Sequence, residues 1–213
     1  MVSATFSSLP GRREERRHER REAILDVAQQ SFLEQGYDGT TMSAIAAALG
    51  GSKGTLWSYF ASKDLLFAAV LDRATEQFRK GLATALDFSS PIKIALGEFC
   101  RQFLRTLTLP EAAALHRLVV GETQRFPEVG RIFFERGPGR TRKLLADYLG
   151  AAMERGQLRR DDPVAAAEQL TGLCLGGCHM QLLLGLIGKA GPAEIEADVR
   201  RALAVFMRAY APA

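Results

Sequence analysis

The sequence has no apolar run long enough to cross a membrane, which takes about 18 consecutive apolar residues. The stretch 173–187 comes nearest, but glycines, Cys178, His179 and Gln181 interrupt it. The first 21 residues carry arginines and no apolar core of the kind that a secretory signal contains. Cysteine is scarce too, with three among 213 residues and no disulfide-like spacing. These absences predict a cytoplasmic protein without a membrane partner.

Strand signals and catalytic signatures are also missing. No Asp-Gly or Asn-Gly turn stands between alternating β-branched segments. There is no nucleophile elbow, phosphate loop or zinc-protease helix, and His18, His116 and His179 lie far apart in the chain. We therefore predict an all-α protein that is not an enzyme and that has no cofactor and no metal.

What is present is a short two-helix pattern over residues 41–60. Ile45 and Leu49 share one face of the first helix, and the glycines 50–51 end it, because glycine readily takes the positive φ of a sharp helix end. Ser52 is placed to cap the second helix. Two helices joined by about three residues are typical of the helix-turn-helix that sets a recognition helix into the DNA major groove.

The second helix has one apolar face and one polar face when it is projected at 100° per residue. Leu56 and Phe60 mark the buried face. The residues predicted to face DNA are small or hydroxyl-bearing, or lie at the two sides of that face. They are Lys53, Gly54, Thr55, Trp57, Ser58 and Tyr59. The alternative is an ordinary tight helical corner, in which Trp57 and Tyr59 are half-buried packing residues.

The flanking segments complete a three-helix head. Residues 20–36 have apolar positions at helical spacing and end at Gly36, and Thr41 is a natural cap for the next helix. Ser62 can cap a long helix, with Lys63 in its first turn, where the helix dipole disfavours a cation. A phosphate contact would explain Lys63 there; a solvated surface lysine is the alternative.

With these residues in view, 20–70 resembles the N-terminal DNA-binding domain of the TetR family of transcriptional regulators. The resemblance is carried by Ala23-Ile24-Leu25-Asp26-Val27-Ala28, Phe32, Gly36, Thr40-Thr41, Ile45-Ala46, Gly50, Ser52-Lys53-Gly54-Thr55-Leu56, Tyr59-Phe60, Ser62-Lys63 and Leu65-Leu66. It implies that Ser43, Lys53, Gly54, Thr55 and Trp57 approach the bases or the adjacent backbone. It implies phosphate contacts for Thr41, Ser52, Tyr59 and Lys63. Two departures, Gly51 for a branched residue and Trp57 for tyrosine, predict an unusual operator.

The N-terminal segment before this domain carries a repeated arginine pattern. Pairs of arginines recur every four residues over 12–21, interrupted by glutamates, so on a helix they form a basic stripe beside an acidic one. This predicts an extension of the first helix, disordered when free, that grips phosphates or a narrow minor groove. A solvated helix held by ion pairs four residues apart is the alternative. We expect residues 1–9 to be a disordered tail and 10–66 to be the DNA-binding domain.

The remaining residues, 67–213, are predicted to form a helical ligand-binding and dimerisation domain. Proline and glycine breaks separate helices expected at 64–86, 92–108, 111–125, 128–136, 139–155, 163–187 and 192–210. The segment 117–156 also resembles the C-terminal domain of one TetR subgroup. A mostly apolar effector pocket is predicted to be lined by Phe99, Phe103, Leu104, Leu107, His116, Val120, Phe134, Leu145, Tyr148 and Met180. Alternatively, these residues are plain core.

The last two helices carry the predicted homodimer interface. An apolar stripe at helical spacing and a glycine-rich neighbouring helix supply its residues, Gly176, Ile195, Val199, Ala202 and Phe206. The alternative is that both helices only close the core of one chain. Cys174 and Cys178 lie one helical turn apart, but His179 is rotated away, so packing is favoured over metal binding.

Together these features predict a ligand-responsive transcriptional repressor. It would bind a pseudo-palindromic double-stranded DNA operator as a homodimer and be released by a small apolar or amphipathic effector. The alternatives are a helical adaptor or ligand-processing bundle that has lost operator binding, and a thiol-based redox-sensing regulator.

Overall fold

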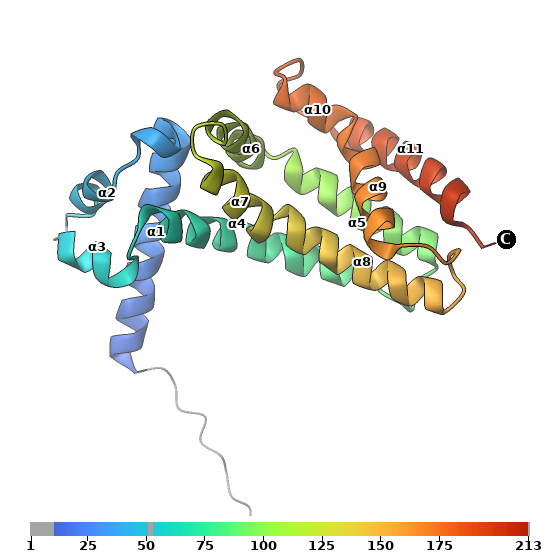
Figure 1. The fold of residues 1–213 in the computed structure, drawn as a ribbon, viewed down its shortest axis with the longest axis horizontal. Coiled ribbons are helices and arrows are strands. Elements are labelled where there is room, and N and C mark those ends of the chain that lie inside the picture. The colour runs from blue at the N-terminus through green and yellow to red at the C-terminus, as the bar shows by residue number, and fades with distance from the viewer. Residues whose placement is uncertain (1–10, 51–52, 213) are drawn as a thin grey trace, which may run out of the picture. The chain divides into compact units, whose positions relative to one another are not determined.

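The computed structural model describes residues 11–50 and 53–212, without the side chains of Arg12, Lys53 and Gln77. The predicted tail 1–9, Gly51 and Ser52 lie outside the described residues. Helices follow one another along the chain as α1 Arg12–Gly39, α2 Met42–Ala48, α3 Lys53–Tyr59, α4 Lys63–Ala85, α5 Ile92–Leu107, α6 Pro110–Glu122, α7 Pro127–Arg136, α8 Pro138–Glu154, α9 Pro163–Leu175, α10 Cys178–Leu183 and α11 Pro192–Tyr210 (Figure 1). No strand occurs in this described part, which agrees with the predicted all-α fold. Among the same residues, no helix combines the length and apolarity that crossing a membrane requires.

The chain divides into two compact units, the first ending at Val70 and the second beginning at Leu71. The boundary falls inside α4, a few residues beyond the predicted end of the DNA-binding domain at residue 66. Each unit has its own buried apolar residues. α4 therefore belongs partly to each unit.

The first unit is built on aromatic packing between α1 and α4. The ring of Phe32 lies 5.8 Å from that of Tyr37 and 5.0 Å from that of Phe67, measured between centroids. All three side chains are buried. Gly36 lies between the two α1 rings with φ 74° and ψ 177°, outside the helical region, so α1 is kinked at the residue where the sequence predicted a stop. The Thr40 hydroxyl donates to the Gly36 carbonyl at 2.7 Å and closes this bend.

The second unit is organised around α9, which packs against both α8 and α11, while α11 also packs against α5 (Figure 1). Its core contains Phe99, Leu145, Leu170 and Phe206, each with 1% exposure or less. The helices expected between 64 and 155 and over 192–210 are confirmed, with ends that differ by a few residues. The prolines and glycines between these helices were therefore sufficient to predict, to within a few residues, where each helix begins and ends.

The single helix predicted over 163–187 is wrong, because the chain breaks between α9 and α10. Gly177 has φ −102° and ψ −124°, outside the helical region. The buried carboxylate of Asp198, from α11, accepts the Cys178 backbone N–H at 2.7 Å. A Cβ on Gly177 would lie 2.1 Å from that carboxylate, so only glycine leaves room for it. The partner that breaks the helix is therefore distant in sequence.

The predicted dimer stripe on α11 is also corrected by the structure. Ile195, Val199, Ala202 and Phe206 are at most 6% exposed within a single chain. They are members of its core and offer no surface to a partner. The alternative, that this stripe closes the core of one chain, is the arrangement observed. Gly176 is exposed and stays a candidate.

Candidate nucleic-acid interface

α2 and α3 form the helix-turn-helix that the sequence predicted. The Thr41 hydroxyl accepts the Ala44 N–H at 3.1 Å and caps α2. Gly50 has φ 63°, a conformation that glycine adopts without strain, and its N–H donates to the Ala47 carbonyl at 3.0 Å. This turn ends α2 and redirects the chain toward α3.

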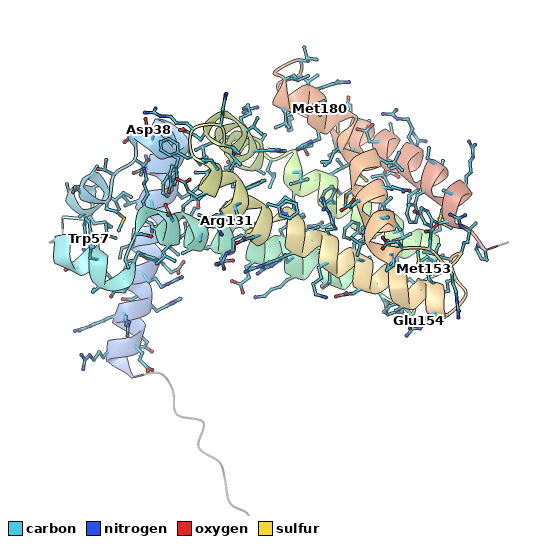
Figure 2. All side chains as sticks on the ribbon, in the orientation of Figure 1. Asp38, Trp57, Arg131, Met153, Glu154 and Met180 are labelled. Carbon is cyan, nitrogen blue, oxygen red and sulfur yellow. The ribbon has the colours of Figure 1, made fainter. Side chains whose placement is uncertain are left out.

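Helix α3 presents the face that the helical projection predicted. Leu56 and Phe60 are buried in the first unit, whereas the backbone or side chains of Gly54, Thr55 and Ser58 are exposed. Trp57 is 42% exposed and lies on the α3 helix of Figure 2, and Tyr59 is partly exposed. Ser43 and Thr41 are exposed on the neighbouring helix start. The predicted set is thus brought to one unit, apart from Ser52 and the side chain of Lys53, which are not described.

Arginines of the predicted arm pack on the helix-turn-helix. α1 begins at Arg12, so the extension is helical without DNA, whereas the sequence interpretation expected it to be disordered when free. The Arg17 guanidinium lies 6.0 Å from the Tyr59 ring centroid, and that of Arg21 lies 5.6 Å from the Phe60 ring. Arg20 donates to the Leu49 carbonyl at 3.5 Å. These arginines pack α1 against the end of α2 and against α3, a role that spacing alone did not indicate.

Lys63 occupies the first turn of α4, and the structure supplies an intramolecular reason for a cation there. Its ammonium donates to the Tyr37 carbonyl at 2.8 Å and lies 4.2 Å from the Tyr37 ring centroid. The Tyr37 hydroxyl in turn donates to Asp64. Lys63 is only partly exposed, so the solvated-lysine alternative does not describe it. Its phosphate contact remains a prediction.

The residues predicted to line the effector pocket divide into two groups. Phe99, Phe103, Leu104, Leu145 and Tyr148 are buried in the core of the second unit, and Leu107 and His116 are partly buried. Val120, Phe134 and Met180 are exposed side chains. The Phe99 and Phe103 rings stack at 5.9 Å, as core aromatics do. The pocket itself remains a prediction.

The cysteines are arranged for packing rather than for redox chemistry. Cys100, Cys174 and Cys178 are all buried and unpaired by disulfides. A hydrogen bond with Cys174, together with burial, raises the pKa of Cys100 well above its ordinary value. Burial and the neighbouring Asp198 raise the pKa of Cys178 to about 12. Reactive thiols need a lowered pKa and access, so neither thiol fits a sensor. Within the described residues, no cluster of three metal-ligating side chains occurs.

The sequence interpretation missed a histidine pair in the second unit. His179 of α10 lies 5.5 Å from His116 of α6, measured between ring centroids. The two residues are 63 positions apart, and the predicted continuous helix over 163–187 gave no reason to bring them together. No periodicity in the sequence could have signalled this pair.

Comparison with known proteins places the whole chain in one family. Residues 24–70 match the model of bacterial regulatory proteins of the TetR family. Residues 94–212 match the C-terminal domain of AefR-like transcriptional repressors. Because these matches cover more than half of the chain, it belongs to the TetR family of transcriptional regulators. It is a DNA-binding regulator rather than an enzyme.

Two solved structures match this chain over nearly its full length, and a curated repressor matches over a shorter segment. The flavonoid-responsive regulator FrrA is 35% identical, with a TM-score of 0.81, and the match covers 92% of this chain and 98% of that one. A TetR-family regulator from Mesorhizobium loti MAFF303099 is 26% identical, with a TM-score of 0.80 and the same coverage. The repressor ComR of Escherichia coli K12 is 40% identical over 58 residues, which are 27% of this chain and 28% of ComR.

Proposed function

We propose that the protein is a ligand-responsive repressor that binds a pseudo-palindromic operator as a homodimer in the cytoplasm. The observation that carries this proposal is the exposed polar face of α3, with Gly54, Thr55 and Ser58 outward and Leu56 buried. Small and hydroxyl side chains allow close approach to base edges in the major groove. The repressor sense is supported by the AefR-like match and by ComR, which is a repressor.

The test is selection of DNA from a pool of random duplexes at near-physiological salt, followed by sequencing of the retained molecules. Enrichment of a palindrome is expected, because a two-fold dimer presents two recognition helices to two half-sites about 34–36 Å apart. Retention without enrichment that fades as salt rises would instead support the adaptor alternative.

The effector is proposed to be a small apolar or amphipathic molecule bound in the second unit. FrrA is flavonoid-responsive, which supports an aromatic effector for this chain as well. By linkage, operator and effector must weaken each other's binding by the same factor. An effector that leaves operator affinity unchanged would contradict this part of the proposal.

Ion pairs onto α4 support a route from effector to DNA. Asp72 of α4 pairs with Arg136 of α7 at 2.8 Å and with Arg140 of α8 at 2.7 Å. The Thr75 hydroxyl also donates to the Arg136 carbonyl at 3.3 Å. Because α4 continues into the first unit, a shift of α7 on effector binding would be passed to α4. We propose that this shift changes the separation of the two DNA-binding heads.

The dimer surface is now proposed on the exposed faces of α9 and α11, which pack side by side. Gly172 and Leu173 of α9 and Gly176, which follows it, are exposed, as are Ala204 and Val205 of α11. A Cβ at either glycine would meet no atom within 4 Å, so the chain's own packing does not require these glycines. Close approach of a partner helix would explain them.

The Val205→Asp variant is expected to convert the dimer to a monomer, because a carboxylate would be buried unpaired at the proposed interface. Operator affinity should then fall by at least about tenfold, since the second half-site no longer binds cooperatively. Sedimentation measures the mass and a mobility shift measures the affinity. Val120→Asp on α6 is the matched control, since Val120 is 67% exposed and Val205 is 50% exposed. A dimeric Val205→Asp protein would exclude this surface.

The Lys63→Ala variant separates a phosphate contact from a purely structural role. With a phosphate contact, binding to all sequences weakens and the slope of log affinity against log salt flattens by about one unit. Loss of the Tyr37 interactions alone would lower the melting temperature and leave this slope unchanged. Titrations at several salt concentrations, together with thermal unfolding, distinguish the two outcomes.

A further inference from the structure

His179 is a buried side chain whose ring nitrogens have no hydrogen-bond partner among the described residues. It is 2% exposed, and neither ring nitrogen makes a hydrogen bond within the described residues. Burial, with a smaller effect of His116, lowers the pKa of His179 to about 4, so the ring is neutral at ordinary pH. A neutral imidazole has one donor and one acceptor. A buried polar atom left unpaired destabilises the folded chain, and a ligand that hydrogen-bonds to it would remove that cost.

The surroundings of His179 are aromatic and come from three helices. His116 of α6 has its ring 5.5 Å from that of His179, and Phe133 of α7 stacks on His116 at 5.7 Å. α10 packs against α6, and Arg117 of α6 donates to the Leu182 carbonyl at 3.2 Å. His116 is partly exposed, and the neighbouring Met180 is exposed on α10 (Figure 2). The histidine pair thus connects a buried position with the surface.

We propose that His179 and His116 form the polar end of the effector site and that this end takes an uncharged aromatic compound bearing a hydroxyl group. The hydroxyl would donate to one nitrogen of His179, and the aromatic ring would pack on the Phe133–His116 pair. This inference rests on the proposed function and names the class of effector for it.

The chemistry of the pair selects this class of ligand. A phenolic hydroxyl is both a donor and an acceptor, which matches a neutral imidazole. A carboxylate fits less well, because it has no hydrogen-bond donor for the acceptor nitrogen of a neutral imidazole and would lose its hydration beside a buried ring. A metal ion is disfavoured, because the described residues hold no group of three ligating side chains. An aromatic ring stacks favourably on neighbouring rings at these distances.

The position of the pair also connects it with α4. Phe133, which stacks on His116, lies one helical turn before Arg136 on α7. Arg136 is paired with Asp72 of α4 at 2.8 Å. A ligand whose ring packs on the Phe133–His116 pair would therefore act on the helix that is paired with α4. This is the differential contact that a ligand needs in order to shift a conformational equilibrium.

The experiment uses the full chain, its selected operator, and two probes that differ by one hydroxyl group, 7-hydroxyflavone and flavone. Calorimetry measures binding to the free protein, and a mobility shift measures release from DNA. For the wild type, 7-hydroxyflavone is expected to bind at least about tenfold more tightly than flavone, the effect of one recovered hydrogen bond. It should also weaken operator binding.

His179→Phe is the decisive variant, because phenylalanine keeps a flat ring and removes the two nitrogens. It should melt no lower than the wild type, since it loses no hydrogen bond. It should lose the tenfold preference for 7-hydroxyflavone. Gln181→Ala is the matched control on α10, because Gln181 is exposed, two residues from His179. It should behave as the wild type.

The remaining outcomes contradict either this inference or the proposed function, and the two cases can be told apart. Absence of 7-hydroxyflavone binding to the wild type overturns the ligand class, and an unchanged preference in His179→Phe overturns the site. Both leave operator binding intact, whereas a failed operator selection overturns the proposed function. If His179→Phe does not fold, the site is tested instead by NMR of the imidazole nitrogens in the wild-type protein. Addition of 7-hydroxyflavone should shift the nitrogen resonances of His179 and His116 but not those of His18. Absence of a shift at His179 would contradict the proposed site.

Discussion

The Gly177→Ala variant is expected to lose about 3–5 kcal/mol of stability, the effect of breaking a buried charged contact. Its Cβ would lie 2.1 and 2.2 Å from the two Asp198 carboxylate oxygens. The carboxylate, on a residue only 4% exposed, would have to leave the Cys178 N–H that it accepts at 2.7 Å. Denaturant unfolding measures the loss, and effector response should fall with it because α10 carries His179.

The matched control for this prediction is Gly121→Ala on α6. A Cβ at Gly121 meets no atom within 4 Å, and its backbone is helical. Alanine there should be neutral or stabilising by up to about 1 kcal/mol, because glycine is the poorer helix former. Equal losses in both variants would show that the Asp198 contact does not hold the break between α9 and α10.

Stability is expected to fall as the pH is lowered from 6.5 to 4, by about 3 kcal/mol from His179 alone. Burial lowers the pKa of His179 from 6.5 to about 4 in the folded chain. In this window the unfolded chain binds a proton that the folded chain does not, so acid favours unfolding. Burial also lowers the pKa of His116, the titratable ring facing His179, and this adds a loss of the same sign.

The measurement is denaturant unfolding at several pH values for the wild type and for His179→Phe. The variant should keep more of its stability at pH 4 to 5, because it has no proton to gain at position 179. The contribution of His116 remains in both proteins and so cancels in the comparison. Identical pH profiles would mean that the His179 ring titrates as it does in the unfolded chain.

The helix-turn-helix was predictable because its signals are local. Thr41 caps α2, Gly50 provides a positive φ, and the Ser62 hydroxyl accepts the Leu65 N–H at 3.2 Å to cap α4. Each of these contacts joins residues within three positions. Helical spacing similarly placed Leu56 inward and Thr55 outward.

The second unit was predicted less well because its decisive contacts are not local. The break at Gly177 depends on Asp198, and the histidine pair depends on two helices 63 residues apart. The stripe on α11 has the same periodicity whether it faces its own core or a partner. Sequence pattern gives the face of a helix but not which neighbour covers it.

The packing of the α1 arginines determines where the DNA-binding unit must begin if it is to be transplanted into another protein. The family match begins at residue 24, yet Arg17, Arg20 and Arg21 lie against Tyr59, Leu49 and Phe60. A chimera that transplants this head from residue 24 onward would carry the recognition helix without the arginines that brace it. A faithful transplant must start at Arg12, where α1 begins.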